Sequence, residues 1–231
     1  MNKLLRKLAL FLTSTSVIIT VVNSRPVKAT VIVDQGTIDP TGAYNSDLNK
    51  PSQQANSFFL SEDTEITEIT WSGRHAGVYT VPTDSFTLRI FSFENGTLLP
   101  ESEPLVNINI DSLIRTDSGI DFVFGEDIFN YSAVFQPFTL PANDYFLSIF
   151  NNSQGTRSWY WVLTPTGDGV RAHRGVDGEP WIPYDYERRV YNNLAFTIRG
   201  ESIKPVPEPT AILGILAIGT LGAASTLKRN L

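Results

Sequence analysis

The stretch FTLRIFSF, residues 86–93, followed by ENGT, residues 94–97, decides the fold class of this 231-residue chain. Phe86, Leu88 and Ile90 would lie on one face of a strand, and Thr87, Arg89 and Phe91 on the other, because side chains alternate with a period of two. Asn-Gly is the strongest short signal for a β-hairpin. The chain is therefore expected to turn back at residues 94–97.

The same alternation continues on both sides of this strand. It is found at residues 65–71, 106–110, 129–135, 145–149, 158–163 and 193–199. No segment between them has the pattern of a soluble helix. Short strands at this spacing predict an all-β fold, an antiparallel β-sandwich that is jelly-roll-like, over residues 55–200. About 175 residues suffice for a single domain with its own core.

Two segments of the chain do not show this periodicity. Residues 34–54 are poor in large apolar side chains and rich in Asp, Asn, Gly, Ser and Pro. We therefore expect residues 30–54 to be a flexible N-terminal segment. Residues 164–186 form a second long irregular stretch, with Trp181 between two prolines. Loops of this length in a compact domain are often functional.

The charge of the chain excludes some partners. All 24 acidic residues lie after residue 29, and of the 18 basic residues five precede residue 30 and two lie at 228–229. Residues 30–227 thus carry 11 basic and 24 acidic side chains, a net charge of −13. Such a surface is unsuited to nucleic acid or to anionic lipid. Because the chain has no cysteine, its stability must come from the core and not from disulfides.

The N-terminus has the features of a signal peptide at residues 1–29. Lys3, Arg6 and Lys7 form a positive n-region, and residues 8–22 form an apolar stretch. Val27 and Ala29 place small or short side chains at the positions that signal peptidase reads, so we expect cleavage after Ala29. The alternative is an uncleaved N-terminal anchor.

The C-terminus has the features of a membrane anchor. Residues 210–227 contain no charge and no proline, and a helix of this length would span roughly 27 Å, close to the thickness of a bilayer core. Lys228 and Arg229 would hold residues 228–231 on the cytoplasmic side. A soluble amphipathic helix would need a polar stripe that residues 211–224 lack. Residues 201–209 are expected to be the linker.

This tail resembles the PEP-CTERM sorting signal of bacterial envelope proteins. The resemblance covers about 25 residues and is carried by Pro207, Glu208 and Pro209, then the apolar helix, then the basic end. It implies recognition by an exosortase, a membrane-embedded transpeptidase or protease, in a diderm bacterium that makes exopolysaccharide. The protein would pass through the inner membrane and reach the cell-envelope surface or the extracellular matrix. Residues 138–152, 158–161 and 193–198 also resemble the β-sandwich ectodomain of anchored bacterial surface proteins, which implies a fold and no site.

Catalysis has little support in the sequence. The only histidines, His75 and His173, are about a hundred residues apart, and His75 is expected in a surface loop. Neither belongs to a metal-binding motif, and no nucleophile elbow, phosphate-binding loop or cysteine nucleophile is present. The expected catalytic and metal residues are therefore none, and the protein is expected not to be an enzyme.

Aromatic residues and carboxylates are the candidates for binding. Trp159 and Trp161 share one face of a strand, as core residues or, alternatively, as a stacking platform for sugars. Trp181 and Tyr184 are the preferred candidates for an exposed glycan-binding pair. Structural calcium is a further option, with ligands from Asp34, Asp39 and Asp47 or from Asp168 and Asp177. Neither group has EF-hand spacing, so we expect no cofactor beyond that option.

These features together predict an exported, non-enzymatic protein with a structural or adhesive role in the envelope or matrix. The alternative is a surface carbohydrate-binding module that recognises exopolysaccharide. A secreted glycoside hydrolase is a distant third, because an acidic sandwich offers many carboxylates and nothing singles out a pair.

Overall fold

A computed structural model describes residues 29–48, 50–77, 84–153, 157–184 and 193–203. Within these ranges the chain forms β-strands and no helix, and the strand ladders are antiparallel. The prediction of an all-β fold with antiparallel sheets is confirmed. The strands are β1 Thr30–Gln35, β2 Asp39–Asn45, β3 Gln53–Leu60, β4 Thr64–His75, β5 Phe86–Ser92, β6 Val106–Asn109, β7 Ile114–Asp121, β8 Asp127–Leu140, β9 Asn143–Asn151, β10 Trp159–Thr164, β11 Arg171–Arg174, β12 Ile182–Pro183, β13 Asn193–Leu194 and β14 Phe196–Ser202.

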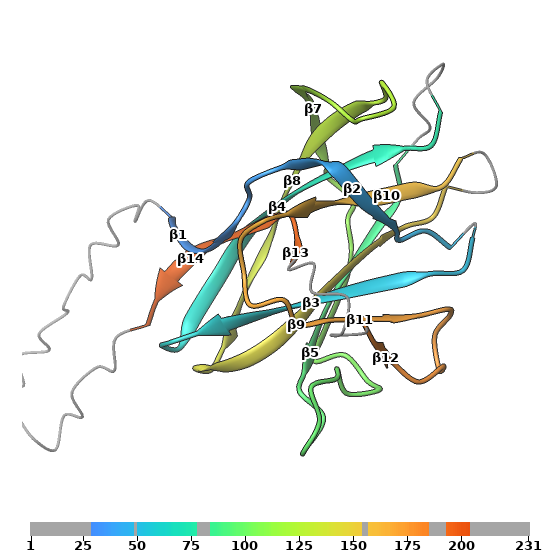
Figure 1. The fold of residues 1–231 in the computed structure, drawn as a ribbon. Coiled ribbons are helices and arrows are strands. Elements are labelled where there is room, and N and C mark those ends of the chain that lie inside the picture. The colour runs from blue at the N-terminus through green and yellow to red at the C-terminus, as the bar shows by residue number, and fades with distance from the viewer. Residues whose placement is uncertain (1–28, 49, 78–83, 154–156, 185–192, 204–231) are drawn as a thin grey trace, which may run out of the picture.

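The first sheet, sheet A, is organised around the long strand β4. One edge of β4 pairs with β8, which in turn pairs with β7. The other edge pairs with β14 over its first part and with β10 over its last residues. Beyond these lie β1 beside β14, and β2 and β13 beside β10. In Figure 1 the hairpin of β7 and β8 projects at the top of this sheet.

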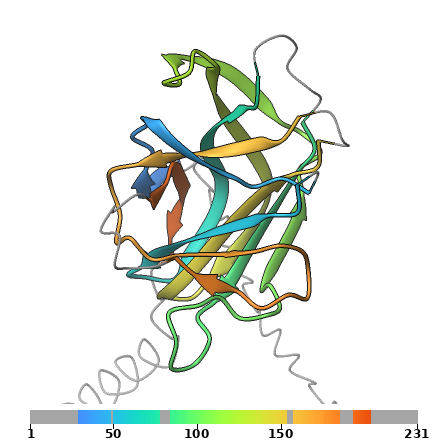
Figure 2. The same ribbon diagram turned by 45° about the vertical axis from the view of Figure 1, so that its right-hand side comes forward.

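The second sheet, sheet B, has the strand order β12-β11-β3-β9-β5-β6. Figures 1 and 2 show it below and alongside sheet A, so that the two sheets form the layers of a sandwich. The chain crosses between the sheets over short connections, at residues 61–63 from β3 to β4 and at residues 141–142 from β8 to β9. These connections keep the two sheets close together along one end.

The main core lies between the sheets and is rich in aromatic side chains. Trp71 and Tyr131, paired across β4 and β8, stack with ring centroids 5.6 Å apart. Phe86 of sheet B meets the Trp159 ring edge-on at 4.9 Å, which joins the two layers. The alternation predicted from the sequence is confirmed here, because Phe86, Leu88 and Ile90 are all buried. Offset and edge-on contacts of this kind add to the stabilisation from burial itself.

The expectation of a flexible segment at residues 30–54 is wrong for most of its length. Strand β1 pairs with β14 and strand β2 pairs with β10, both in sheet A. The side chains of β2 are mostly half buried, and its sequence, DPTGAYN, has the composition of a loop. These strands are ordered by backbone hydrogen bonds to distant strands, and composition does not report such pairing.

The first and last strands lie side by side. Thr30 at the start of β1 is opposite Gly200 near the end of β14, and the Thr30 hydroxyl donates a hydrogen bond to the Gly200 carbonyl at 3.2 Å. Figure 1 shows both strands at the left of the molecule. We call this end of the sandwich the proximal end. The opposite, distal end carries His75, Asn151 and Trp159 at the far ends of β4, β9 and β10.

Several predicted segments lie outside the described residues. They are the apolar part of the signal peptide, the triplet Pro207, Glu208 and Pro209, the helix expected at residues 210–227, and Lys228 and Arg229. Ala29, the expected cleavage residue, is described and directly precedes β1. In the part of the chain that the structure covers, there is no helix of the length and hydropathy required to cross a bilayer.

Candidate functional site

The tryptophan pair of β10 belongs to the core. Trp159 and Trp161 are both fully buried between the sheets. The Trp161 indole N–H donates a hydrogen bond to the carbonyl oxygen of Ala195 at 2.9 Å. The interpretation of these residues as core is therefore confirmed, and they offer no surface to a ligand.

Trp181 is also buried, and this corrects the expectation of an exposed glycan-binding pair. Its side chain is 6% exposed and packs on the outer face of sheet B against Phe91, at a centroid distance of 5.4 Å. The indole N–H donates a hydrogen bond to the Glu101 carbonyl at 3.2 Å, and the Arg174 guanidinium lies 4.4 Å from the ring centroid. The protein therefore covers the ring with Arg174 and Phe91 and satisfies its polar edge. A flat aromatic platform needs an exposed ring, which Trp181 does not have.

Tyr184 lies on the other side of strand β11 from Trp181. Its ring is 4.7 Å from that of His173 and 4.9 Å from that of Tyr44, and the Arg171 guanidinium lies 4.3 Å from its centroid. The hydroxyl donates a hydrogen bond to Gln54 at 3.0 Å. Burial raises the pKa of Tyr184 to about 12. The structure therefore does not bring Trp181 and Tyr184 together into one site.

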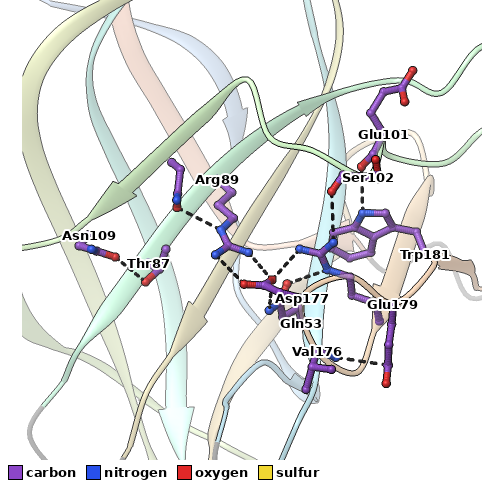
Figure 3. Close-up of polar contacts among 12 residues, drawn as sticks. Gln53, Thr87, Arg89, Glu101, Ser102, Asn109, Val176, Asp177, Glu179 and Trp181 are labelled. Carbon is purple, nitrogen blue, oxygen red and sulfur yellow. Dashed lines mark hydrogen bonds and ion pairs between the residues drawn. The ribbon is translucent and has the colours of Figure 1, made fainter.

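Asp177, a calcium candidate, is bound by two arginines instead (Figure 3). Its carboxylate accepts two hydrogen bonds from Arg89, one from Arg174 at 2.8 Å and one from the Gln53 amide at 2.9 Å. The hydrogen bonds from Arg89 lower the pKa of Asp177 to about 2. This network fastens the loop between β11 and β12 onto sheet B, because Arg89 lies on β5 and Gln53 on β3.

The other calcium candidates are also used within the protein. Asp34 accepts a hydrogen bond from the Gly36 N–H, and Asp39 accepts one from the Thr41 N–H, as in turns closed by aspartate. Asp168 accepts hydrogen bonds from the Ser57 hydroxyl, and Asp47 lies fully buried at the distal end. Across the described ranges, no three acidic, histidine or cysteine side chains come together as a metal site would require.

His75 is buried, contrary to the expectation of a surface loop. It is the last residue of β4, and its side chain is only 3% exposed. The Nε2 atom lies 2.9 Å from Oδ1 of Asp84, whose Oδ2 accepts a hydrogen bond from Arg115 at 2.6 Å. His173 is half buried on β11, where burial and the neighbouring Arg171 lower its pKa. Neither histidine lies in an open cleft.

A hollow of about 240 Å³ lies on the outer face of sheet A, and the sequence did not single it out. Its polar lining comes from β4, β7, β8 and β14 and consists of Thr70, Ser72, Thr116, Asn130, Ser132 and Thr197. Two cross-strand rows place these residues together. In one, Thr197 pairs with Thr70 and Thr70 with Ser132; in the other, Ser72 pairs with Asn130 and Asn130 with Thr116.

The depth of this hollow has a simple cause. Next to these short side chains, the paired residues Arg199 and Glu68 cross the same face with longer ones. On the other side of the hollow, Arg74 is paired with Glu126 at 2.9 Å. The sequence could have indicated that these side chains share the outer face of the sheet. Thr70, Ser132 and Thr197 each stand between two apolar residues that point inward.

Comparison with known proteins adds nothing to these observations. No protein-family model matches the chain, and no curated protein matches it either.

Proposed function

We propose that this chain is an exported protein of the bacterial cell envelope or extracellular matrix, with a non-enzymatic structural or adhesive role. Signal peptidase would remove residues 1–29, and the C-terminal helix would hold the protein in the inner membrane during transit. An exosortase would then read Pro207, Glu208 and Pro209. The jelly-roll-like sandwich would be left at the envelope surface or outside the cell.

The pairing of Thr30 with Gly200 is the observation that carries this proposal. A leader before Thr30 and a tail after Ser202 both meet the sandwich at its proximal end. A domain built in this way can face a membrane with one end during export, while its distal end points away.

The burial of the titratable pair at the distal end supports a role without catalysis. A general base must come within about 3 Å of the proton that it removes from a substrate. His75 and Asp84 are 3% and 6% exposed in their side chains, and they are engaged with each other and with Arg115. Nothing in the described part of the chain favours a glycoside hydrolase over the structural role.

The carbohydrate-binding alternative cannot rest on Trp181, which is buried. The observation that favours it is the hollow on sheet A, whose lining is uncharged and combines six polar side chains with apolar surface. This second candidate is compatible with the first, because an adhesive matrix protein needs a surface that holds a ligand.

The export proposal is tested in the producing bacterium by replacing Pro207, Glu208 and Pro209 together with Ala. The native protein should begin at Thr30 and should have lost the C-terminal helix, as shown by terminal sequencing and intact mass. The triple variant should begin at Thr30 but keep Leu231 and remain in the inner membrane. A matched variant, Ser202→Ala with Ile203→Ala, should be processed as the native protein is. An intact Met1 would refute the signal peptide, and a mass unaffected by the triple change would refute sorting.

A further inference from the structure

We propose that the hollow on the outer face of sheet A is a binding site for an uncharged sugar ring. Four hydroxyl side chains with free hydrogen-bonding capacity, Thr70, Ser72, Thr116 and Ser132, lie next to the carboxamide of Asn130. This lining contains both donors and acceptors and no ionised group, which matches the adjacent hydroxyls of a sugar.

The protein itself orients these groups. The Ser72 hydroxyl donates to Asn130 Oδ1 at 2.8 Å, which leaves the Asn130 N–H groups as donors and the Ser72 oxygen as an acceptor. The Ser132 hydroxyl donates to Glu68 at 2.7 Å, so its oxygen is also left as an acceptor. A site with groups already fixed loses less side-chain entropy when a ligand binds.

Thr70 and Thr116 flank strand β8. Neither hydroxyl hydrogen-bonds to another described residue. They stand on β4 and β7, on either side of β8, and both line the hollow. They are the groups whose hydrogen-bonding capacity the fold itself leaves unused, and we assign them to the ligand.

Size and charge select the ligand class. A volume of 240 Å³ equals about eight water molecules at roughly 30 Å³ each, which is room for one sugar ring at a time. Two carboxylates stand close to the lining, Glu68 beside Ser132 and Asp34 beside Thr197. They would repel a uronic acid or a sulfated sugar, so the ligand is a neutral one. Ile114, 61% exposed at the rim, offers an apolar contact for the C–H face of a ring.

The site is tested with the full-length chain in a zwitterionic detergent, because the sugar headgroup of an alkyl glycoside would compete. The probes are the methyl glycosides of glucose, galactose and mannose, with glucuronate as the charged comparison, followed by saturation-transfer NMR. We expect at least one neutral glycoside to bind with a dissociation constant on the order of 1 mM, as is usual for a ligand of this size. Glucuronate should bind at least tenfold more weakly.

Thr70→Val together with Thr116→Val removes both unused hydroxyls with little change of shape and should weaken binding of the neutral glycoside at least tenfold. The matched control is Thr87→Val, on the outer face of sheet B, which should bind as the native chain does. If the double variant fails to fold, the single change at the exposed Thr116 decides the matter. Binding that survives these changes, a preference for glucuronate, or no binding by any neutral glycoside would each overturn the proposal. Because purified protein is used, none of these results depends on the export route.

Discussion

The carboxylate of Asp47 accepts a hydrogen bond from the backbone N–H of Trp159 at 2.8 Å in the interior of the distal end. Its other oxygen accepts a hydrogen bond from the Ser153 hydroxyl at 2.9 Å. Asp47→Ala would leave buried donors without an acceptor, and we expect the free energy of unfolding to fall by roughly 3 kcal/mol. Chemical denaturation measures this loss. Asp47→Asn keeps one acceptor and should lose less.

The control for this prediction is Asp39→Ala, which removes an exposed carboxylate that closes a turn at Thr41. This change should lower the free energy of unfolding by no more than about 1 kcal/mol, since water can replace the lost hydrogen bond. Equal costs at the two positions would mean that Asp47 does not join the sheets as its contacts indicate.

Trp161 and Trp181 are expected to differ in their contribution to stability. Trp161→Ala leaves a cavity in the main core and should lower the free energy of unfolding by about 3–5 kcal/mol. Trp181→Ala affects the smaller apolar cluster of Ala55, Phe91, Phe146 and Ala172, and should cost about 2–3 kcal/mol. Phe124→Ala, at a ring that is 78% exposed, should change the stability by no more than about 0.5 kcal/mol. A Trp181 variant as stable as the native protein would show that this ring is not held in the cluster.

The Asp177 network predicts a pH dependence with a definite sign. The two arginines lower the pKa of Asp177 from 3.8 to about 2, so its ionised form stabilises the folded state. This contribution is complete above the unfolded pKa and is lost as the pH falls through about 2. Because the side chain is 58% exposed, we expect it to be at most about 1 kcal/mol.

The measurement is the difference in the free energy of unfolding between the native chain and Asp177→Asn. It should be constant from pH 7 to pH 5, shrink below pH 4 and be lost as the pH falls through about 2. Added salt should reduce it at neutral pH, because screening weakens partly exposed pairs. A difference that grew on acidification would contradict the assigned role of the two arginines.

The strand alternation was predictable where one face of a strand meets the core. Tyr145, Leu147 and Ile149 were expected to share a face, and all three are buried. Phe91 was expected on the opposite face from Ile90, yet both are fully buried. The outer face of sheet B at that point is covered by Trp181, which comes from a loop ninety residues later. Such coverage depends on tertiary contacts that local periodicity cannot contain.

The turn at residues 94–97 shows how far a local signal extends. Gly96 has a φ of +78°, and the Thr97 N–H donates to the Glu94 carbonyl at 3.1 Å, as Asn-Gly predicts. The partner strand β6 begins only at Val106, however, after a longer loop. The turn was thus predictable from two residues, whereas the length of the connection was not.

The candidate site was less predictable than the fold. The aromatic residues that sequence reasoning preferred, Trp181 and Tyr184, are engaged with arginines and amides of the protein. The groups that form the hollow, such as Thr70 and Asn130, are residue types found on any solvated strand. Only the register between β4, β7, β8 and β14 brings them together, and register is set by long-range pairing.

The position of β14 between β1 and β4 has a mechanical consequence for a protein held by its tail. A pull on the chain beyond Ser202 acts along the axis of β14. It therefore strains the hydrogen bonds to both neighbouring strands at the same time, in shear, instead of opening them one after another from an edge. Attachment through this strand would let the domain resist flow or traction at the point where the force enters.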